Sequence, residues 1–327
     1  MKNNPMVIAH RGASGYRPEH TREAYLLALE LGAEALEPDI VVSRDGVPVI
    51  RHENELSETT DIAERPEFAD RKTTKELAGF RFTGWFVEDF SWDELQTLEA
   101  RERIPQVRPE NTRYTGAGIL RLGELIELVH AWTAATGSQI TLVIELKHAS
   151  YFSAIGLDLE PILLKELQDF GWISGVQESR LVIESFELPI LKRLKHSGLD
   201  AEYIFLLEAE GAPLDEMLAH GTAARPFADF LTETGLRELK NDIDGVSVDK
   251  SMILSWSTES GYHSSDLVHR VHQAGLKAYT WTLRPESQFL ANPEGNAEEE
   301  FRMILDSGVD GVFADYPDLV LNLLDED

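Results

Sequence analysis

Histidines and carboxylates gather in the first fifty-two residues of the chain, in a pattern that could perform acid–base chemistry. One apolar run ends at His10 and another ends at His52. Between them, Glu37 and Asp39 stand two positions apart within a third apolar stretch. Side chains at i and i+2 of an extended chain point the same way, so these two carboxylates would converge. Two imidazoles beside paired carboxylates predict acid–base catalysis next to a hard cation.

A later apolar run supplies a third carboxylate. Glu145 and Lys147 repeat the i, i+2 spacing, so both would face the same cavity. Ionised carboxylates in a barrel mouth are costly unless they are paired or bind a metal. Glu37, Asp39 and Glu145 form an all-oxygen ligand set, which suits Mg²⁺ or Ca²⁺ and not zinc. The sequence therefore predicts a site for one divalent cation.

Charge around this predicted site favours an anionic ligand. Arg11 follows His10 directly, and with Lys147 and a divalent cation it would more than offset three carboxylates. A locally positive pocket suits phosphate. The chain as a whole is very acidic, with 58 acidic against 30 basic residues and a formal net charge of −28. That balance argues against nucleic acid or an anionic membrane surface as a partner.

Composition sets further limits. The chain has 327 residues, 43% of them hydrophobic, which is enough for a sizeable core. It has no cysteine, which excludes disulfides, thiolate nucleophiles and thiolate zinc sites. No stretch reaches the roughly 18 apolar residues of a membrane span, and no signal peptide precedes the first apolar run. We expect a cytoplasmic protein if Met1 is native, and a periplasmic or secreted one if a leader was removed. The oligomeric state is left open.

The elements that must position these residues alternate between extended and helical patterns. Nine extended runs are expected at 6–9, 35–42, 47–50, 139–146, 181–186, 201–207, 245–248, 276–282 and 308–313, and the clearest helices at 21–31, 122–136, 159–170 and 189–195. The turn signal Asp45-Gly46 makes the run 47–50 a hairpin arm, which leaves eight strands. Repeated strand–helix units imply a parallel sheet, and their number favours a (β/α)₈ TIM-type barrel. The predicted site residues all lie late in a strand or just after it, where such barrels hold their active sites.

Residues 53–118 interrupt this alternation. They are polar, and they contain the aromatic side chains Phe80, Phe82, Trp85, Phe86, Phe90 and Trp92. An excursion of this length between core elements is usually functional. We expect residues 1–327 to form one catalytic barrel domain with an insertion at 53–118 that acts as a lid or subdomain. Its aromatics would form a small core of their own or contact the substrate.

Several motifs carry a family resemblance: the run 10–21, Glu37-x-Asp39, His52, Glu145-x-Lys147, Trp281-Thr282 and the closing run 311–317. Together they resemble glycerophosphodiester phosphodiesterases, over residues from about 7 to 319. The insertion makes the chain similar to the longer members, such as the bacterial periplasmic enzyme. The resemblance implies a phospholipase-C-like barrel in which His10 and His52 are the acid–base pair. It also implies that Glu37, Asp39 and Glu145 bind the metal and that Arg11 and Lys147 bind the phosphate.

The resemblance also implies a reaction, the metal-dependent hydrolysis of glycerophosphodiesters such as glycerophosphocholine or glycerophosphoethanolamine. The free 2-hydroxyl of glycerol would attack the phosphorus to give a cyclic phosphate, which water opens to glycerol 3-phosphate. The resemblance favours His52 as the general acid that protonates the leaving alcohol. Two residues depart from the family pattern: Glu53 stands where Asp is usual, and Arg284 follows the tryptophan motif where Asn is usual. We expect Arg284 to affect the choice of headgroup.

Other residues near the predicted site have less specific interpretations. Phe186 and Trp281 each end a strand and would line the alcohol side of the pocket or pack in the core. Glu19 and His20 are expected to brace the first loop and helix and to take no part in chemistry. His148, like His130 and His220, is expected on the surface or in a helix. Asp249 and Lys250 are at most rim contacts. Asp315 could be a loop cap as readily as a site residue.

Two rival functions remain. A sphingomyelinase-D-like or lysophospholipid phosphodiesterase would use a similar site, but such lipases lack the His-Arg-Gly run, and this chain has no disulfide and no obvious apolar interfacial patch. A catalytically silent module that only binds phosphodiesters would keep the fold. The presence of every catalytic residue type argues against that second alternative.

Overall fold

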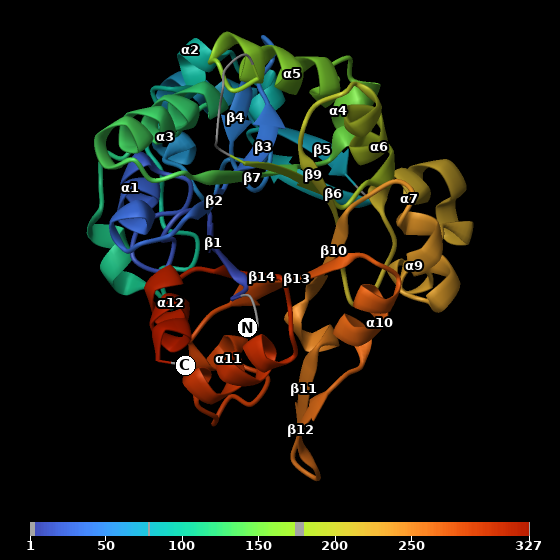
Figure 1. Cartoon of the computed structure of the whole chain (residues 1–327). Coiled ribbons are helices and arrows are strands. Elements are labelled where there is room, and N and C mark those ends of the chain that lie inside the picture. The colour runs from blue at the N-terminus through green and yellow to red at the C-terminus, as the bar shows by residue number, and fades with distance from the viewer. Residues whose placement is uncertain (1–3, 78, 174–179, 327) are drawn as a thin grey trace.

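A closed barrel of parallel strands forms the centre of the molecule (Figure 1). The computed structural model describes residues 4–77, 79–173 and 180–326. In ring order the barrel contains β1 (Met6–His10), β2 (Ala35–Glu37) with β3 (Asp39–Val42), β7 (Thr141–Leu146), β8 (Leu181–Ser185), β9 (Glu202–Leu207), β10 (Gly245–Asp249), β13 (Lys277–Leu283) and β14 (Gly311–Ala314). Pairing of β1 with β14 and of β2 with β7 closes the ring. The predicted eight-stranded barrel is confirmed.

The predicted run 35–42 is divided into β2 and β3 at Pro38. Proline has no N–H for the ladder, but its carbonyl still accepts a hydrogen bond from the Glu145 N–H at 3.0 Å. Both halves pair with β7, so the break leaves the strand in its place in the barrel. β4 (Pro48–Ile50) lies antiparallel to β3, which confirms the hairpin arm.

Helices surround the barrel (Figure 1). They are α1 (Arg22–Glu30), α3 (Leu122–Thr136), α4 (Ala149–Ala154), α5 (Leu159–Asp169), α6 (Leu188–His196), α7 (Leu214–His220), α8 (Phe227–Phe230), α9 (Glu233–Leu239), α10 (Leu267–Gln273), α11 (Ala297–Asp306) and α12 (Pro317–Asp325). The four helices expected most clearly from the sequence are among them. Thr21 caps α1, its side chain accepting a hydrogen bond from the Ala24 N–H. No helix within the described residues is both long and apolar enough to cross a membrane.

The barrel interior contains a small apolar layer, separate from the larger core between strands and helices. Seven of the strands each contribute one buried side chain to it: Ile8, Ala35, Val143, Val182, Ile204, Tyr279 and Phe313. Because strand side chains alternate in direction, the residues two positions further along each strand face the same interior. That next layer lies at the carboxyl ends of the strands.

The predicted insertion, residues 53–118, contains an antiparallel hairpin, β5 (Thr73–Leu77) and β6 (Phe80–Gly84), and a short helix, α2 (Trp92–Leu95). Its six predicted aromatic residues differ in exposure. Trp85, Phe86 and Phe90 are buried and Trp92 is partly buried, whereas Phe80 and Phe82 on the hairpin are 68% and 43% exposed. A second hairpin, β11 (Leu254–Ser257) and β12 (Gly261–Ser264), projects from the barrel (Figure 1) and was not expected from the sequence.

Candidate active site

The catalytic groups expected from the sequence lie above the apolar layer of the barrel. Moving two residues toward the carboxyl end from these seven side chains reaches Leu206 on β9 and, on the other six strands, His10, Glu37, Glu145, Glu184, Trp281 and Asp315. All of these except Asp315 line a cavity of about 940 Å³, whose lining also includes Arg11, His52, Lys147 and Phe186. One alternating pattern thus places a packed core at one level and polar chemistry at the next.

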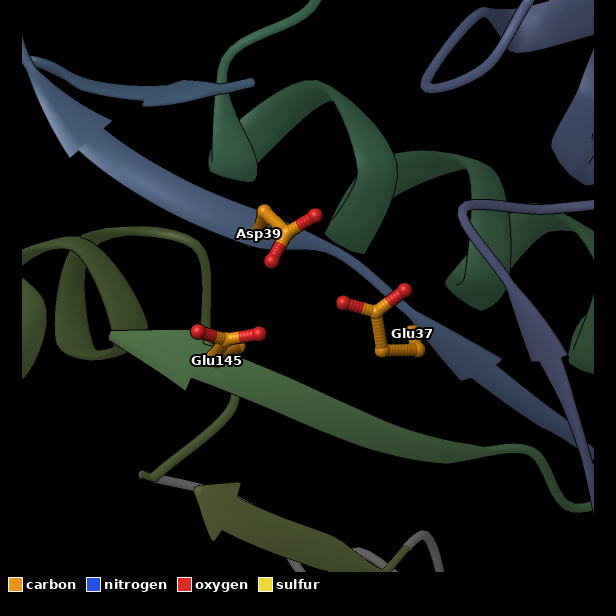
Figure 2. A group of neighbouring side chains, drawn as sticks. All are labelled: Glu37, Asp39 and Glu145. Atoms are coloured by element: carbon orange, nitrogen blue, oxygen red, sulfur yellow. The ribbon is translucent and has the colours of Figure 1, made fainter. Parts of the chain in front are cut away.

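Glu37, Asp39 and Glu145 point toward one another from adjacent strands (Figure 2). One carboxylate oxygen from each lies within 4.8 Å of the others, and all three residues are buried. Buried oxygens Oδ1 of Asp39 and Oε1 of Glu145 accept no hydrogen bond of good geometry. A single hard cation, with ligand bonds of about 2.0–2.6 Å, can bridge such a set. The group therefore fits a divalent metal ion.

Electrostatics within this group also favour a cation. Burial raises the pKa of Glu145 to about 8, and burial together with Asp39 raises the pKa of Glu37 well above its usual value. Burial would also raise the pKa of Asp39. The nearby Lys147, followed by His52, has the opposite effect, and the pKa of Asp39 lies well below its usual range. Three carboxylates this close together repel one another when all are ionised, so without a cation some of them stay protonated. A bound cation could take the place of those protons.

Two buried cationic side chains lie against the carboxylates. Lys147 Nζ is 2.7 Å from Glu145 Oε1 and 3.5 Å from Asp39 Oδ1. Arg11 Nε is 3.3 Å from Asp39 Oδ2, and the Arg11 backbone N–H donates to Glu37 Oε2 at 2.7 Å. If a divalent cation neutralised the carboxylates, the charges of Arg11 and Lys147 would become available to an anion.

The loop after β1 holds Arg11 in a left-handed backbone conformation, with φ of 61°. The next residue, Gly12, also has a positive φ of 82°, and a Cβ there would lie 2.7 Å from the Ala24 backbone. Glu19 and His20 brace this loop as expected. Arg11 Nη1 donates to Glu19 at 3.0 Å, and His20 Nε2 is 2.8 Å from Asp39 Oδ2.

His10 is held by a buried carboxylate. Its Nδ1 donates to Asp315 Oδ1 at 2.6 Å, and Arg108 and Arg284 donate to the other Asp315 oxygen at 2.6 Å and 2.7 Å. Burial opposes ionisation of Asp315, but Arg284 and His10 keep its pKa well below the usual range. The ionised carboxylate fixes the hydrogen on Nδ1 and leaves Nε2 for a substrate.

His52 has an equivalent arrangement. Its Nδ1 donates to Glu53, and Arg103 donates to both Glu53 oxygens, at 2.7 Å and 2.5 Å. Burial, followed by the nearby Arg11, lowers the pKa of His10 to about 4 and that of His52 to about 3. Both imidazoles are therefore neutral at pH 7 in this state. An anionic substrate beside them would raise both pKa values.

The structure brings residues to the site that sequence reasoning did not place there. Glu184 faces the cavity from β8, beside Glu145 on the next strand, and burial raises its pKa well above the usual value. Asp315 is a partner of His10 and not merely a loop cap. His148 was expected on the surface or in a helix, but it lines the cavity with a left-handed backbone φ of 51°. Glu184 and Asp315 could have been found by extending the i+2 rule to every strand.

The cavity has an aromatic side and an apolar mouth. Phe186 and Trp281 line it together, with ring centroids 5.9 Å apart. Phe80 and Phe82 line the mouth from the hairpin. Leu218, which is 60% exposed, follows the lining residue Met217 on α7. These apolar side chains come from segments far apart in the chain, the hairpin and α7.

A TIM-type barrel with ionisable groups at the carboxyl ends of its strands is an enzyme architecture. The comparisons with known proteins are specific. The family described as "Glycerophosphoryl diester phosphodiesterase family" matches residues 10–319. Because this match spans nearly the whole chain, the chain belongs to that family, whose members are phosphoric diester hydrolases that release glycerol 3-phosphate.

Individual relatives agree over comparable lengths. A glycerophosphodiester phosphodiesterase of Arabidopsis thaliana is 29% identical, over 96% of this chain and 84% of the relative. One from Haemophilus influenzae is 26% identical, over 99% and 91%. A solved structure of an Oleispira antarctica phosphodiesterase, in complex with the product sn-glycerol-3-phosphate, has a TM-score of 0.65 and 22% identity, over 98% of this chain and 97% of that one. It supports the same fold.

The raised pKa of Glu145, about 8, predicts that a metal ion must displace a proton to bind. We expect Mg²⁺ or Ca²⁺ to bind more tightly as pH rises from about 6 to 9, with about one proton or more released per ion near pH 7. Isothermal titration calorimetry in buffers of different ionisation enthalpy measures both quantities. Glu145→Gln should weaken binding and reduce proton release.

A matched control is Glu187→Gln, because Glu187 is also buried and has a raised pKa of about 6 but is not one of the three converging carboxylates. This variant should bind the ion as the wild type does. Binding that is independent of pH and unaffected by Glu145→Gln would contradict the site.

Proposed function

We propose that this enzyme hydrolyses small glycerophosphodiesters, such as glycerophosphocholine or glycerophosphoethanolamine, by two-histidine acid–base catalysis beside one Ca²⁺ or Mg²⁺. The observation that carries the proposal is that two imidazoles, each backed by an ionised carboxylate, line one cavity together with Glu37 and Glu145, which converge with Asp39. Glu37, Asp39 and Glu145 would hold the cation. When bound, it would offset their charge and lower the pKa of a nearby hydroxyl.

Arg11 and Lys147 would bind the phosphate. Both are buried beside the carboxylates, so their positions are set before substrate arrives. The phosphorus gains negative charge on its oxygens as the nucleophile adds. Fixed cations that need no reorganisation stabilise that charge more in the transition state than in the monoanionic substrate.

The two histidines would move protons at Nε2, because Asp315 and Glu53 occupy Nδ1 of each ring. In the first step, His10 takes the proton of the glycerol 2-hydroxyl as that oxygen attacks phosphorus, and His52 protonates the departing alcohol oxygen. The product is a five-membered cyclic phosphate. In the second step the roles reverse, and water opens the ring to glycerol 3-phosphate.

The alcohol side of the cavity would accept a cationic headgroup. Phe186 and Trp281 meet edge to face, and Phe227 adjoins Phe186 at a centroid distance of 6.2 Å. Aromatic faces attract ammonium groups. Glu208 and Asp249 line the same cavity from the ends of adjacent strands, and the described residues form no ion pair with either. Choline and ethanolamine fit such surroundings.

A second candidate, a lysophospholipid phosphodiesterase, is favoured by the apolar mouth. Phe80 and Phe82 are exposed where a small polar diester needs no apolar contact, and one acyl chain could lie against them. A monoacyl substrate can keep the free hydroxyl that the mechanism uses. Diacyl phospholipids lack it, so we expect them to be poor substrates.

Release of glycerol 3-phosphate from glycerophosphocholine, with and without a chelator, tests the proposed activity directly. We expect turnover that stops with chelator and returns with Mg²⁺ or Ca²⁺, and a loss of several orders of magnitude in Glu37→Gln, Asp39→Asn or Glu145→Gln. Lysophosphatidylcholine assayed in parallel separates the two candidates. Full activity of Glu145→Gln in excess chelator would refute the metal-assisted reaction.

The role of His52 as the acid predicts a dependence on the leaving group. His10→Ala and His52→Ala should both be nearly inactive on glycerophosphocholine. A nitrophenyl diester needs little protonation on departure, so His52→Ala should regain much of its kcat on that substrate while His10→Ala stays inactive. Steady-state kinetics with both substrates measures this. Recovery by His10→Ala in place of His52→Ala would reverse the two assignments.

Attack by the substrate's own hydroxyl predicts that this hydroxyl is indispensable. Intramolecular attack can have an effective molarity on the order of 10⁵ M or more, which direct attack by water would not gain. A 2-deoxy analogue of glycerophosphocholine should bind as a competitive inhibitor and show no measurable turnover. Hydrolysis of the analogue at a rate near that of the parent diester would exclude the cyclic phosphate route and leave the phosphodiesterase activity in place.

A further inference from the structure

The insertion sends two arginines into the site from one short stretch of chain, residues 103–108. Arg103 donates to both Glu53 oxygens, at 2.7 Å and 2.5 Å. Arg108 donates to Asp315 Oδ2 at 2.6 Å. Each of these carboxylates accepts the Nδ1 hydrogen of one of the two histidines. The site therefore contains two hydrogen-bonded chains, each made of a histidine, a carboxylate and an arginine of the insertion.

We propose that Arg103 and Arg108 are positioning residues for the two catalytic histidines, so that the insertion completes the acid–base machinery in addition to covering the cavity. The inference rests on the acid–base roles of His10 and His52 in the proposed function. Neither arginine needs to touch the substrate, because each acts through the carboxylate that orients an imidazole.

Geometry supports this role for Arg103. Its two Nη atoms meet the two Glu53 oxygens as a fork, which fixes the plane of the carboxylate as well as its position. The same guanidinium donates to Glu19 at 2.6 Å and 2.8 Å, and Glu19 in turn accepts from Arg11. Arg103 therefore links the partner of His52 to the residue that would bind phosphate.

Arg108 is more deeply placed. Its side chain is 6% exposed and also donates to Glu286 at 2.7 Å and to the Ser14 carbonyl at 3.1 Å. It thus ties the partner of His10 to two further loops. Asp315 differs from Glu53 in having a second arginine, because Arg284 donates to it at 2.7 Å.

This difference predicts opposite orders for activity and stability. Without Arg103, no other arginine among the described residues bonds to Glu53, whereas Asp315 keeps Arg284 when Arg108 is removed. We therefore expect Arg103→Ala to reduce kcat more than Arg108→Ala does. Arg108 is the more buried, with a side chain 6% exposed against 23% for Arg103, so Arg108→Ala should lower Tm more. A purely structural role would make the two orders the same.

The experiment compares Arg103→Ala, Arg108→Ala and Arg103→Lys in the full chain, using glycerophosphocholine and a nitrophenyl diester. We expect kcat on glycerophosphocholine to fall by about 100-fold in Arg103→Ala and about 10-fold in Arg108→Ala, the range for residues that orient a catalytic group, with KM changed only a few-fold. Added guanidinium should restore part of the activity of Arg103→Ala. On the nitrophenyl diester, which needs no acid, Arg103→Ala should recover most of its loss.

Arg101→Ala is the matched control, because Arg101 is an arginine of the same stretch whose partners are Glu99, at 3.0 Å, and Glu64, at 3.7 Å. It should retain wild-type kinetics. Nitrogen NMR of the histidines provides a readout that does not depend on turnover, since loss of Arg103 should change the tautomer or ordering of His52 and leave His10 unchanged.

The inference is overturned if Arg103→Ala keeps wild-type kcat and an unchanged His52 spectrum. It is also overturned if its loss is the same on both diesters, is not relieved by guanidinium and follows the fall in Tm. Failure of the proposed function would look different, because His52→Ala or His10→Ala would then remain active on glycerophosphocholine.

Discussion

Three carboxylates converging inside a barrel mouth are the constraint on which the site depends. Glu37, Asp39 and Glu145 lie too close together to be ionised at once without compensation. Lys147 and Arg11 lie against them, and protons take up part of the remaining charge. A divalent cation that displaced the protons would turn this balanced group into a net positive pocket, and such a pocket would favour phosphate.

The parallel barrel makes that concentration of charge tolerable. The barrel strands all end on the same side, so polar residues two positions beyond the apolar layer meet in one place, and the side chains of the layer beneath them are apolar and buried. The break at Pro38 adds to the effect. It lets Glu37 end one short strand and Asp39 begin the next, with both still paired to neighbouring strands.

Much of this could be predicted from local pattern. The alternation of apolar runs and helices was sufficient for the barrel and its hairpin arm, and the i, i+2 spacing was sufficient to bring Glu37, Asp39 and Glu145 together. Contacts between distant segments were missed. The same spacing rule would place Asp315 at the level of His10, but no local pattern reports that these two residues, 305 positions apart, form a hydrogen bond. His148 was misplaced because its direction depends on a left-handed backbone conformation that the sequence does not reveal. The hairpin β11–β12 was missed because its strands show no strong alternation of apolar and polar residues.

Glu53 departs from the family pattern, and only its contacts in the structure indicate what this departure could do. As a sequence feature it is one methylene longer than the usual Asp. In the structure it contacts two groups at once, His52 on one side and the Arg103 fork on the other. Arg103 belongs to the predicted insertion, so a residue of that segment contacts the carboxylate that His52 contacts. This geometry favours the interpretation that Glu53 and the insertion together orient His52.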